Sequence, residues 1–555
     1  MATITRVDPV TFGVISGRLS GIVQEMQDSI FRTGYSTIVR ESHDASCMIL
    51  DAEGNVVGEH VIAPLHITAL PIVVRRVREI FQDDLAPGDV FLTNHPYAAD
   101  VTHSIDMAVT SPVFAGGRVV AFCASIAHKS DLGGAVPGTA NGSARELFQE
   151  GILYPPVRYM KRGALVRDVD AILRANSRTP ELVAGDIRGQ IGVARIGERR
   201  LLETIERYGL ETVLAVFEEK QDKTELRVRR ALAAWEDGVA EAETRMEGDS
   251  ADDAIRYHVR VEKAGDRLVF DFTGSSDQTT MPVNVRPSIV RGCCYYALIG
   301  MIDPQIENNG GLARAVETRV RPGSVLDPHF PAPTNAYMTT AAALTEAIVA
   351  ALSRLARDRR VAGVGGVGAL AIAGERADAT PFQTYELLGS AYGARSGADG
   401  LSGISVLLSN SRTAPIEIME TEFPLRFRRF ELIADSGGAG TFRGGLGYAR
   451  EYVMGAPRAQ LTLRGGKHAI AASGIDGGAD GRLGSLVVGP GTPEARAYPS
   501  RFSGVALSEN DVIRVEKAGG GGLGPPAARS FESILDDVLD GYVTARAAVA
   551  EYGID

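Results

Sequence analysis

Cysteine, tryptophan and histidine are all scarce in this chain. Among its 555 residues there are four Cys, one Trp and nine His. The cysteines stand at positions 47, 123, 293 and 294, a spacing that matches neither a metal site nor a disulfide framework. Buried thiols in a reducing compartment are the simplest account of them, so we expect a cytoplasmic protein without disulfides.

Several sequence signals are also missing. No run of 18 apolar residues is present, and the first residues lack a charged segment followed by an apolar one, so we expect neither a membrane span nor secretion. There is no P-loop and no strand–GxGxxG–helix unit, which argues against ATP binding by this chain itself. A net charge of −11 and a pI near 5.5 argue against a nucleic-acid partner.

Glycine, by contrast, is abundant. The chain has 63 Gly, and many of them cluster at 435–447 and 517–526. Glycine permits positive φ and close backbone approach, and tight turns between strands are the usual meaning of such clusters. We therefore expect a glycine-rich β-region near the C-terminus.

The length predicts several lobes, because 555 residues exceed what one core usually holds. The pattern of elements predicts an α+β or mixed α/β fold with four parts. These are an N-terminal α/β lobe (1–139), a helical region (140–250), a second α/β lobe (251–379) and a β- and Gly-rich C-terminal lobe (380–555).

Local patterns predict individual elements within these parts. Apolar residues at helical spacing predict helices over 8–34 and 65–83, the first capped by Asp8 and begun by Pro9. Residues 255–276 predict a β-hairpin, and 285–302 and 337–357 predict two apolar helices. Alternating runs over 380–520 predict antiparallel sheet.

The most informative stretch holds two His-x-x-Asp units, His103 with Asp106 and His128 with Asp131. Imidazole nitrogen and carboxylate oxygen are ligands that zinc, manganese and iron accept. Between the units lie two strand-like runs joined by Ala-Gly-Gly, which is a hairpin signal. Because a hairpin brings the entry of one strand beside the exit of the other, both units are predicted at one end of one sheet, as a metal or catalytic site. The alternative is that each His and each Asp packs or caps locally.

The chain resembles the hydantoinase B family over nearly its whole length. That family includes subunits of ATP-dependent hydantoinases, 5-oxoprolinases and lactamases, and of acetone and acetophenone carboxylases. The matching segments include DPVTFGVISGRL (8–19), ESHDASCMILDAEGNVVGE (41–59), PGDVFLTNHPY (87–97), THSID (102–106), AHKSDLGG (127–134), QEGILYPPVRY (149–159), VFDFTGSSDQ (269–278), GARSGADGLSG (393–403) and DSGGAGTFRGGLG (435–447).

The resemblance implies a multi-lobed, hydantoinase B-like fold and a partner subunit of the hydantoinase A type, in a heterotetramer. The partner would bind ATP and phosphorylate the substrate. The AHxxD motif of the family implies that His128 and Asp131 hold a divalent metal, zinc, manganese or iron, and the resemblance extends this to Asp106 and His103. His103 is also a candidate catalytic residue, as are Asp44 and His66, the latter as the His of the family's PxH pattern.

One segment departs from the family pattern. The family commonly has Asn-Asp-Pro-Tyr, whereas this chain has His95 in place of that Asp, and Asp100 where small residues are usual. Either His95 and Asp100 join the site, or they are drift in a loop. Glu146 and Glu150 follow the second His-x-x-Asp unit and could supply a carboxylate, but a solvated helix face is the simpler interpretation.

These observations lead to one expected function and two alternatives. We expect a subunit of an ATP-dependent cyclic-amide hydrolase of N-methylhydantoinase, 5-oxoprolinase or lactamase type. It would act with metal-activated water on a phosphorylated small-molecule substrate. The alternatives are a subunit of an ATP-dependent ketone carboxylase, which would depend on bicarbonate, and a non-catalytic scaffold with structural His and Asp residues.

Overall fold

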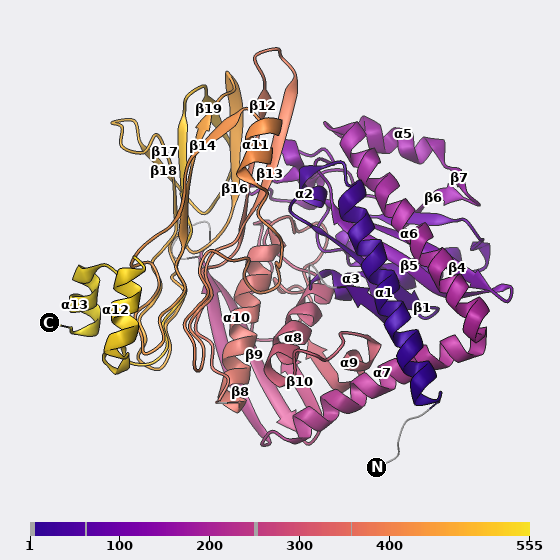
Figure 1. The fold of residues 1–555 in the computed structure, drawn as a ribbon. Coiled ribbons are helices and arrows are strands. Elements are labelled where there is room, and N and C mark those ends of the chain that lie inside the picture. The colour runs from indigo at the N-terminus through magenta and orange to yellow at the C-terminus, as the bar shows by residue number, and fades with distance from the viewer. Residues whose placement is uncertain (1–5, 61–63, 249–252, 357, 555) are drawn as a thin grey trace.

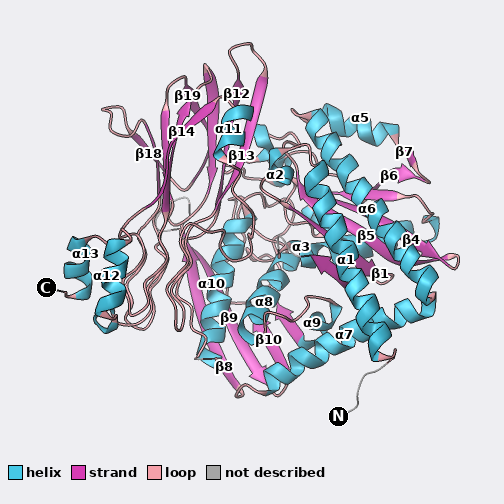
Figure 2. Cartoon of the chain, in the orientation of Figure 1, coloured by secondary structure: helices cyan, strands magenta, loops and turns pink. Residues whose placement is uncertain are grey.

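The computed structural model describes residues 6–60, 64–248, 253–356 and 358–554. Its fold is mixed α+β, with separate sheets along the chain and helices packed against them, as the sequence predicts (Figures 1 and 2). The helical segment within 140–250 is also present, as α5 (Arg167–Ala175), α6 (Pro180–Tyr208) and α7 (Leu210–Ala233). That range additionally holds strands β6 (Val157–Lys161), β7 (Ala164–Leu165) and β8 (Gly238–Met246).

A seven-stranded antiparallel sheet forms the N-terminal lobe, in the order β2-β1-β5-β4-β3-β6-β7. Its other strands are β1 (Ala45–Asp51), β2 (Val56–His60), β3 (Val90–Thr93), β4 (Asp106–Ala115) and β5 (Arg118–His128). The predicted hairpin is β4–β5, and both turn glycines, Gly116 and Gly117, have the positive φ that such a turn needs.

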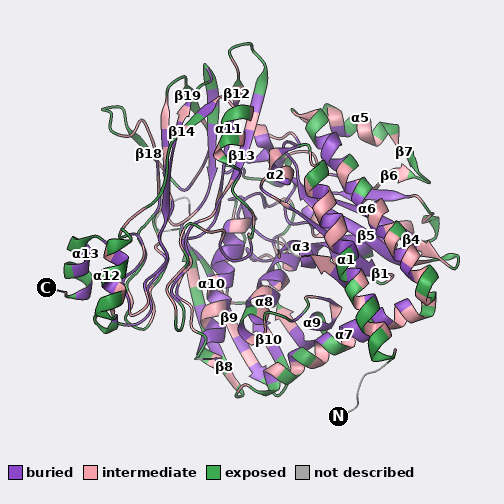
Figure 3. Ribbon diagram, viewed as in Figure 1, coloured by how far each residue is buried: buried purple, intermediate pink, exposed green. Residues whose placement is uncertain are grey.

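Helices cover both faces of this sheet. α1 (Pro9–Thr33) and α6 pack on one face, where Cys47 and Ile49 point, and α3 (His66–Phe81) packs on the other, where Met48 and Leu50 point. Asp8 caps α1 as predicted, since its carboxylate accepts from two amides of the first turn. The central strands β1, β5, β4 and β3 are therefore buried on both faces (Figure 3). Short elements near it are α2 (Thr37–Arg40), α4 (Pro96–Ala99) and the 3₁₀ turns Gln82–Asp84, Pro137–Thr139 and Leu147–Glu150.

The second α/β lobe has a four-stranded sheet of order β11-β10-β9-β8. The predicted hairpin is β9 (Ile255–Ala264) with β10 (Arg267–Asp271), and β11 (Val316–Arg319) runs parallel to β10. The two predicted apolar helices are α8 (Pro287–Ile302) and α10 (Tyr337–Leu355), which share a core with the sheet and with α9 (Gly310–Ala315). Within the described residues α10 alone is long and apolar enough to cross a membrane, but 67% of that window is buried in this core.

The C-terminal lobe is a sandwich of two antiparallel sheets. One has the order β13-β12-β16-β19, with β12 (Gly368–Glu375), β13 (Pro381–Leu388), β16 (Arg458–Arg464) and β19 (Arg501–Ser508). The other has the order β14-β15-β20-β17-β18, with β14 (Leu425–Leu432), β15 (Tyr448–Met454), β20 (Val512–Glu516), β17 (Ser485–Val488) and β18 (Arg496–Tyr498). Their facing side chains form one core. The remaining elements are α11 (Ile416–Glu422), the 3₁₀ turn Pro526–Ala528, α12 (Phe531–Leu539) and α13 (Ala545–Tyr552).

The late glycines do not mainly form tight turns, which corrects the prediction made for them. They lie in extended segments that run side by side below the sandwich, between β8 and α12 (Figure 1). The backbone amides of three consecutive glycines donate hydrogen bonds to carbonyl oxygens of three different segments. These bonds run from Gly520 to Gly445, from Gly521 to Gly363 and from Gly522 to Ala479. A Cβ on these glycines would overlap neighbouring carbonyl oxygens, so glycine permits the close packing of these segments.

Candidate metal centre and active site

Three strand ends and one helix start meet at the candidate site. Asp106 is the first residue of β4 and His128 is the last of β5, and the two are directly paired across the hairpin. His103 lies in the turn that enters β4, and Asp44 immediately precedes β1, next to the end of β5. His66 begins α3. His103, Asp106 and His128 therefore lie together as the sequence predicts, because the start of β4 lies beside the end of β5 in the hairpin.

The Asp106 carboxylate is the centre of the cluster. Its Oδ1 lies 3.0 Å from His103 Nε2 and 3.1 Å from His128 Nδ1, and its Oδ2 lies 3.7 Å from His66 Nε2. The hydroxyl of Thr102 donates to Oδ2. Asp106, His66, His103 and His128 are each at most 3% exposed. Ligand atoms of His103, Asp106 and His128 all lie within 4.8 Å of one another, which is close enough for one metal ion.

The hydrogen bond of His103 Nδ1 determines which ring nitrogen carries the proton. Nδ1 lies 3.0 Å from the carbonyl oxygen of Asn335, and because a carbonyl can only accept, Nδ1 carries the proton. Nε2 then presents a lone pair to the Asp106 carboxylate. Two acceptors 3.0 Å apart need a proton or a cation between them. A divalent cation with nitrogen and oxygen ligands at about 2.0–2.2 Å satisfies both, and a carbonyl behind a ligating imidazole is the usual arrangement at such sites.

A second feature supports the fit of a metal. Among the described residues, Nε2 of His128 is buried and has no hydrogen-bond partner. A buried polar atom without a partner is costly, and it calls for a ligand, an ion or a water. The donor set of imidazole and carboxylate therefore suits zinc, manganese or iron, as the sequence predicts.

Burial and the neighbouring groups shift several pKa values at the site. Burial lowers the pKa of His103 and outweighs Asp106, which acts in the opposite direction, so the neutral, ligating form is favoured. Burial opposes the charge of Asp106, but the surrounding imidazoles, His103 first, hold the pKa of that carboxyl well below its usual range. Burial raises the pKa of Asp44, against the effect of His128 at 3.8 Å.

Asp131 does not join this group. The chain leaves the sheet after His128, and the Asp131 carboxylate accepts from the backbone amides of Gly133, Gly138 and Arg178. It also pairs with the Arg178 guanidinium at 3.1 Å. The two His-x-x-Asp units therefore have different roles. Asp106 lies at the start of β4 beside the two histidines, whereas Asp131 lies beyond the end of β5. The second organises the loop that follows.

His95 and Asp100 also lie outside the cluster. Nδ1 of His95 accepts from the amides of Tyr97 and Ala98 and caps the short helix α4. Burial lowers the pKa of His95, which suits this accepting role. Asp100 adopts a left-handed conformation and pairs with Arg286 at 3.1 Å. The structure thus supports the interpretation of these two residues as loop features.

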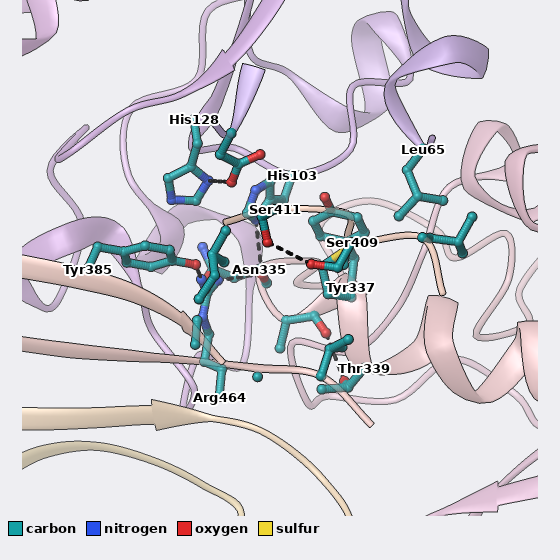
Figure 4. A pocket seen from close by; sticks show the side chains of 18 residues that line it. Leu65, His103, His128, Asn335, Tyr337, Thr339, Tyr385, Ser409, Ser411 and Arg464 are labelled. Carbon is teal, nitrogen blue, oxygen red and sulfur yellow. Dashed lines mark hydrogen bonds and ion pairs between the residues drawn. The ribbon is translucent and has the colours of Figure 1, made fainter. Parts of the chain in front are cut away.

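Several residues that line the site could not be recognised from the sequence. A small cavity of about 50 Å³ opens beside the cluster (Figure 4) and is bordered by side chains from all the sheet-bearing lobes. The ring of Tyr337 lies 4.6 Å from that of His103, and the ring of Tyr385 lies 4.5 Å from that of His128. Asn335, Ser409, Ser411 and Arg464 also line this cavity, together with Asp44, which is a catalytic candidate from the sequence.

Glu150 is buried behind the site, where the sequence favoured a solvated face. Its Oε1 accepts from the amides of Thr334 and Asn335, at 2.8 and 2.7 Å. The Glu150 side chain therefore fixes the loop whose Asn335 carbonyl orients His103. Burial raises the pKa of Glu150 to about 8.

Comparison with known proteins identifies the family of this chain. The family model described as hydantoinase B/oxoprolinase matches residues 8–526. The chain belongs to the hydantoinase B/oxoprolinase family. A protein of Pseudomonas sp. (strain NS671), named as one subunit of a putative D-/L-hydantoinase, is 32% identical over 99% of this chain and 96% of its own length.

Two solved structures have the same fold. The crystal structure of the ATP-dependent caprolactamase from Pseudomonas jessenii superposes with a TM-score of 0.92 at 27% identity, and the match covers 99% of this chain and 97% of that one. Acetone carboxylase in its nucleotide-free structure gives a TM-score of 0.91 at 18% identity, covering 99% of this chain and 80% of that one. The second likeness shows the fold alone.

Proposed function

We propose that this chain is the B-type subunit of an ATP-dependent cyclic-amide hydrolase, of the hydantoinase, 5-oxoprolinase or lactamase type. The observation that carries the proposal is the convergence of His103, Asp106 and His128, whose ligand atoms lie within 4.8 Å of one another beside a cavity. The relatives named as a hydantoinase subunit and an ATP-dependent caprolactamase support the substrate class.

An A-type partner would activate the substrate, because this chain has no P-loop or Rossmann motif. Amide resonance weakens the carbonyl as an electrophile. Phosphorylation of the amide oxygen by the partner would remove that resonance, and ATP would be bound and consumed there. The two chains would form a heterotetramer with two copies of each.

The chemistry at this chain's site would then proceed with water. Addition of one water to the activated carbon gives a tetrahedral species. Cleavage of its C–N bond, with a proton going to nitrogen, opens the ring and leaves an acyl phosphate. A second water hydrolyses the acyl phosphate to a carboxylate and inorganic phosphate, so that one ATP and two waters are consumed for each amide opened.

His103, Asp106 and His128 would hold a divalent cation. When bound, such an ion supplies a water whose pKa is lowered to about 7 in a favourable site. The chain's own groups do the remaining work. Asp44 borders the cavity 3.8 Å from His128 and is placed to accept a proton from an attacking water. The carbonyl of Asn335 holds the His103 ring, and the rings of Tyr337 and Tyr385 exclude bulk water.

His66 has a positioning role in this account. Its Nδ1 lies 3.0 Å from the hydroxyl of Ser46, and its Nε2 lies 3.7 Å from Asp106 Oδ2, whereas His103 and His128 contact Oδ1. It fixes the carboxylate rather than bordering the cavity. Asp131, held by Arg178 and three backbone amides, has no part in the ligand set.

The test is turnover by this chain co-purified with its A-type partner. ADP and ring-opened product are measured on hydantoins, 5-oxoproline and lactams, with and without bicarbonate. Turnover of a cyclic amide without bicarbonate, lost in His128→Ala, is the expected result. Turnover only with a ketone and bicarbonate would show a carboxylase, and full activity of metal-free His128→Ala would leave this chain a scaffold.

A further inference from the structure

Arg464 is a buried cation without a carboxylate partner. It is the last residue of β16, the residue is 5% exposed, and among the described residues no carboxylate forms an ion pair with it. Its Nη1 donates to the carbonyl of Asn335 at 2.6 Å and to the side-chain oxygen of the same residue, and its Nη2 donates to the Tyr385 hydroxyl. Nε is buried and has no partner within the described part of the chain. A buried guanidinium normally has a counter-ion, so this one is incomplete.

The guanidinium borders the cavity of the candidate metal centre. Figure 4 shows the Arg464 side chain rising from its strand beside Tyr385 and Asn335, with His128 and His103 beyond them. Tyr385 links the two parts, since it accepts from Arg464 and its ring lies 4.5 Å from the ring of His128. The hydroxyls of Ser409 and Ser411 border the same cavity and add neutral donors.

The charges around the cavity favour an anion once a metal is present. Asp44 and Asp106 contribute two negative charges at most, and a divalent cation with Arg464 contributes three positive ones. Glu150, the next carboxyl, is mostly protonated at neutral pH because burial raises its pKa to about 8. The surplus positive charge lies in a buried space, where it is only weakly screened. Arg464 also keeps its positive charge at neutral pH, even though burial lowers its pKa to about 10.

We propose that Arg464, supported by the Tyr385 hydroxyl, binds the phosphoryl oxygens of the activated substrate while its carbon lies at the metal centre. The proposal rests on the function proposed above and adds to it a residue that recognises the phosphoryl group of the activated substrate. A planar guanidinium suits phosphate because two N–H groups can meet two oxygens. Arg464 would select activated substrate, hold it during addition of water, and release inorganic phosphate at the end.

The experiment compares phosphate binding by three variants of the complex of this chain with its partner. The partner's own phosphate sites are filled with a non-hydrolysable ATP analogue, and the divalent metal is kept in place in every variant. Inorganic phosphate is then titrated calorimetrically at fixed ionic strength. Arg464→Met is the test, Arg464→Lys retains charge without the planar fork, and Arg458→Met is the control. Arg458 begins the same strand but is exposed at its far end.

Arg464→Met is expected to raise the dissociation constant for phosphate about ten- to a hundredfold, because charge-assisted hydrogen bonds are lost. Arg464→Lys should weaken binding several-fold, and Arg458→Met should leave it unchanged. Metal content should equal that of the wild type in all three. Unchanged phosphate affinity in metal-competent Arg464→Met overturns the proposal. Where that variant does not fold, unchanged affinity in Arg464→Lys overturns it instead.

Turnover separates this proposal from the proposed function. With Arg464→Met, ADP release by the partner should continue while ring-opened product falls. If the wild-type complex opens no cyclic amide but phosphate binding still depends on Arg464, the proposed function fails and the anion site stands. If the wild-type complex opens cyclic amides but phosphate affinity is the same in wild type and Arg464→Met, only the proposed anion site is refuted.

Discussion

Replacing Glu150 with Gln should change how the stability of this protein depends on pH. Glu150 is fully buried, and two backbone amides of the loop containing Asn335 donate to its Oε1. A Gln side chain has nearly the same shape, and its oxygen can accept both bonds. The substitution therefore removes a titrating proton while leaving the loop in place.

The size of the effect follows from the pKa. Burial raises the pKa of Glu150 from 4.5 to about 8 in the folded protein. The folded state thus binds this proton more tightly than the unfolded chain does. Its stabilising effect is complete below the unfolded pKa and is lost as the pH rises through the folded pKa. The full difference corresponds to about 5 kcal/mol, at about 1.4 kcal/mol for each pH unit between the two values.

The assay is thermal melting of wild type and Glu150→Gln from pH 5 to pH 9. The unfolding entropy of a chain of this length is roughly 1.2 kcal/mol per kelvin, so the variant should melt up to roughly 4 °C above wild type at pH 9. The two should coincide near pH 5. The exposed Glu206 of α6 supplies the control variant Glu206→Gln, which should follow wild type throughout. Wild type and Glu150→Gln curves that stay parallel from pH 5 to pH 9 would refute the reasoning.

Two further predictions concern the ligand set and the glycine segments. Asp106→Asn should abolish binding of the divalent metal, whereas Asp131→Asn, which changes only the Arg178 loop, should retain wild-type metal content in elemental analysis; equal losses would contradict the geometry. Gly520→Ala should destabilise the protein by about 3 kcal/mol or more, because its Cβ would overlap the Tyr392 carbonyl. The control is Gly192→Ala in α6, where a Cβ meets open space, and it should be neutral or stabilising by about 1 kcal/mol. Similar melting temperatures of Gly520→Ala and Gly192→Ala would argue against close packing of the glycine segments.

Features determined by neighbouring residues could be predicted from the sequence. The cap of α1 needs only Asp8 and the residues after it, and the β4–β5 hairpin needs only its two strands and the Gly116-Gly117 turn. The hairpin in turn brings Asp106 opposite His128, so the core of the candidate site was within reach. The family motifs pointed to the same stretch.

What sequence reasoning missed depends on distant segments or on how a strand ends. Asn335, Tyr385 and Arg464 reach the cavity from other lobes, and no local pattern marks them. Asp131 has the same spacing from His128 as Asp106 has from His103, but β5 ends at His128 and the chain turns away. The glycine clusters looked like turns because a composition signal cannot distinguish a turn from close packing of extended segments.

The central claim is that His103, Asp106 and His128 hold a divalent metal that serves the chemistry. Elemental analysis of the purified complex tests it most directly, in wild type, in His128→Ala and in His258→Ala, a partly exposed residue of β9 outside the cluster. The account predicts close to one divalent cation per chain in wild type and His258→Ala, and none in His128→Ala. Undiminished metal in His128→Ala, or a fully active wild type without metal, would contradict it.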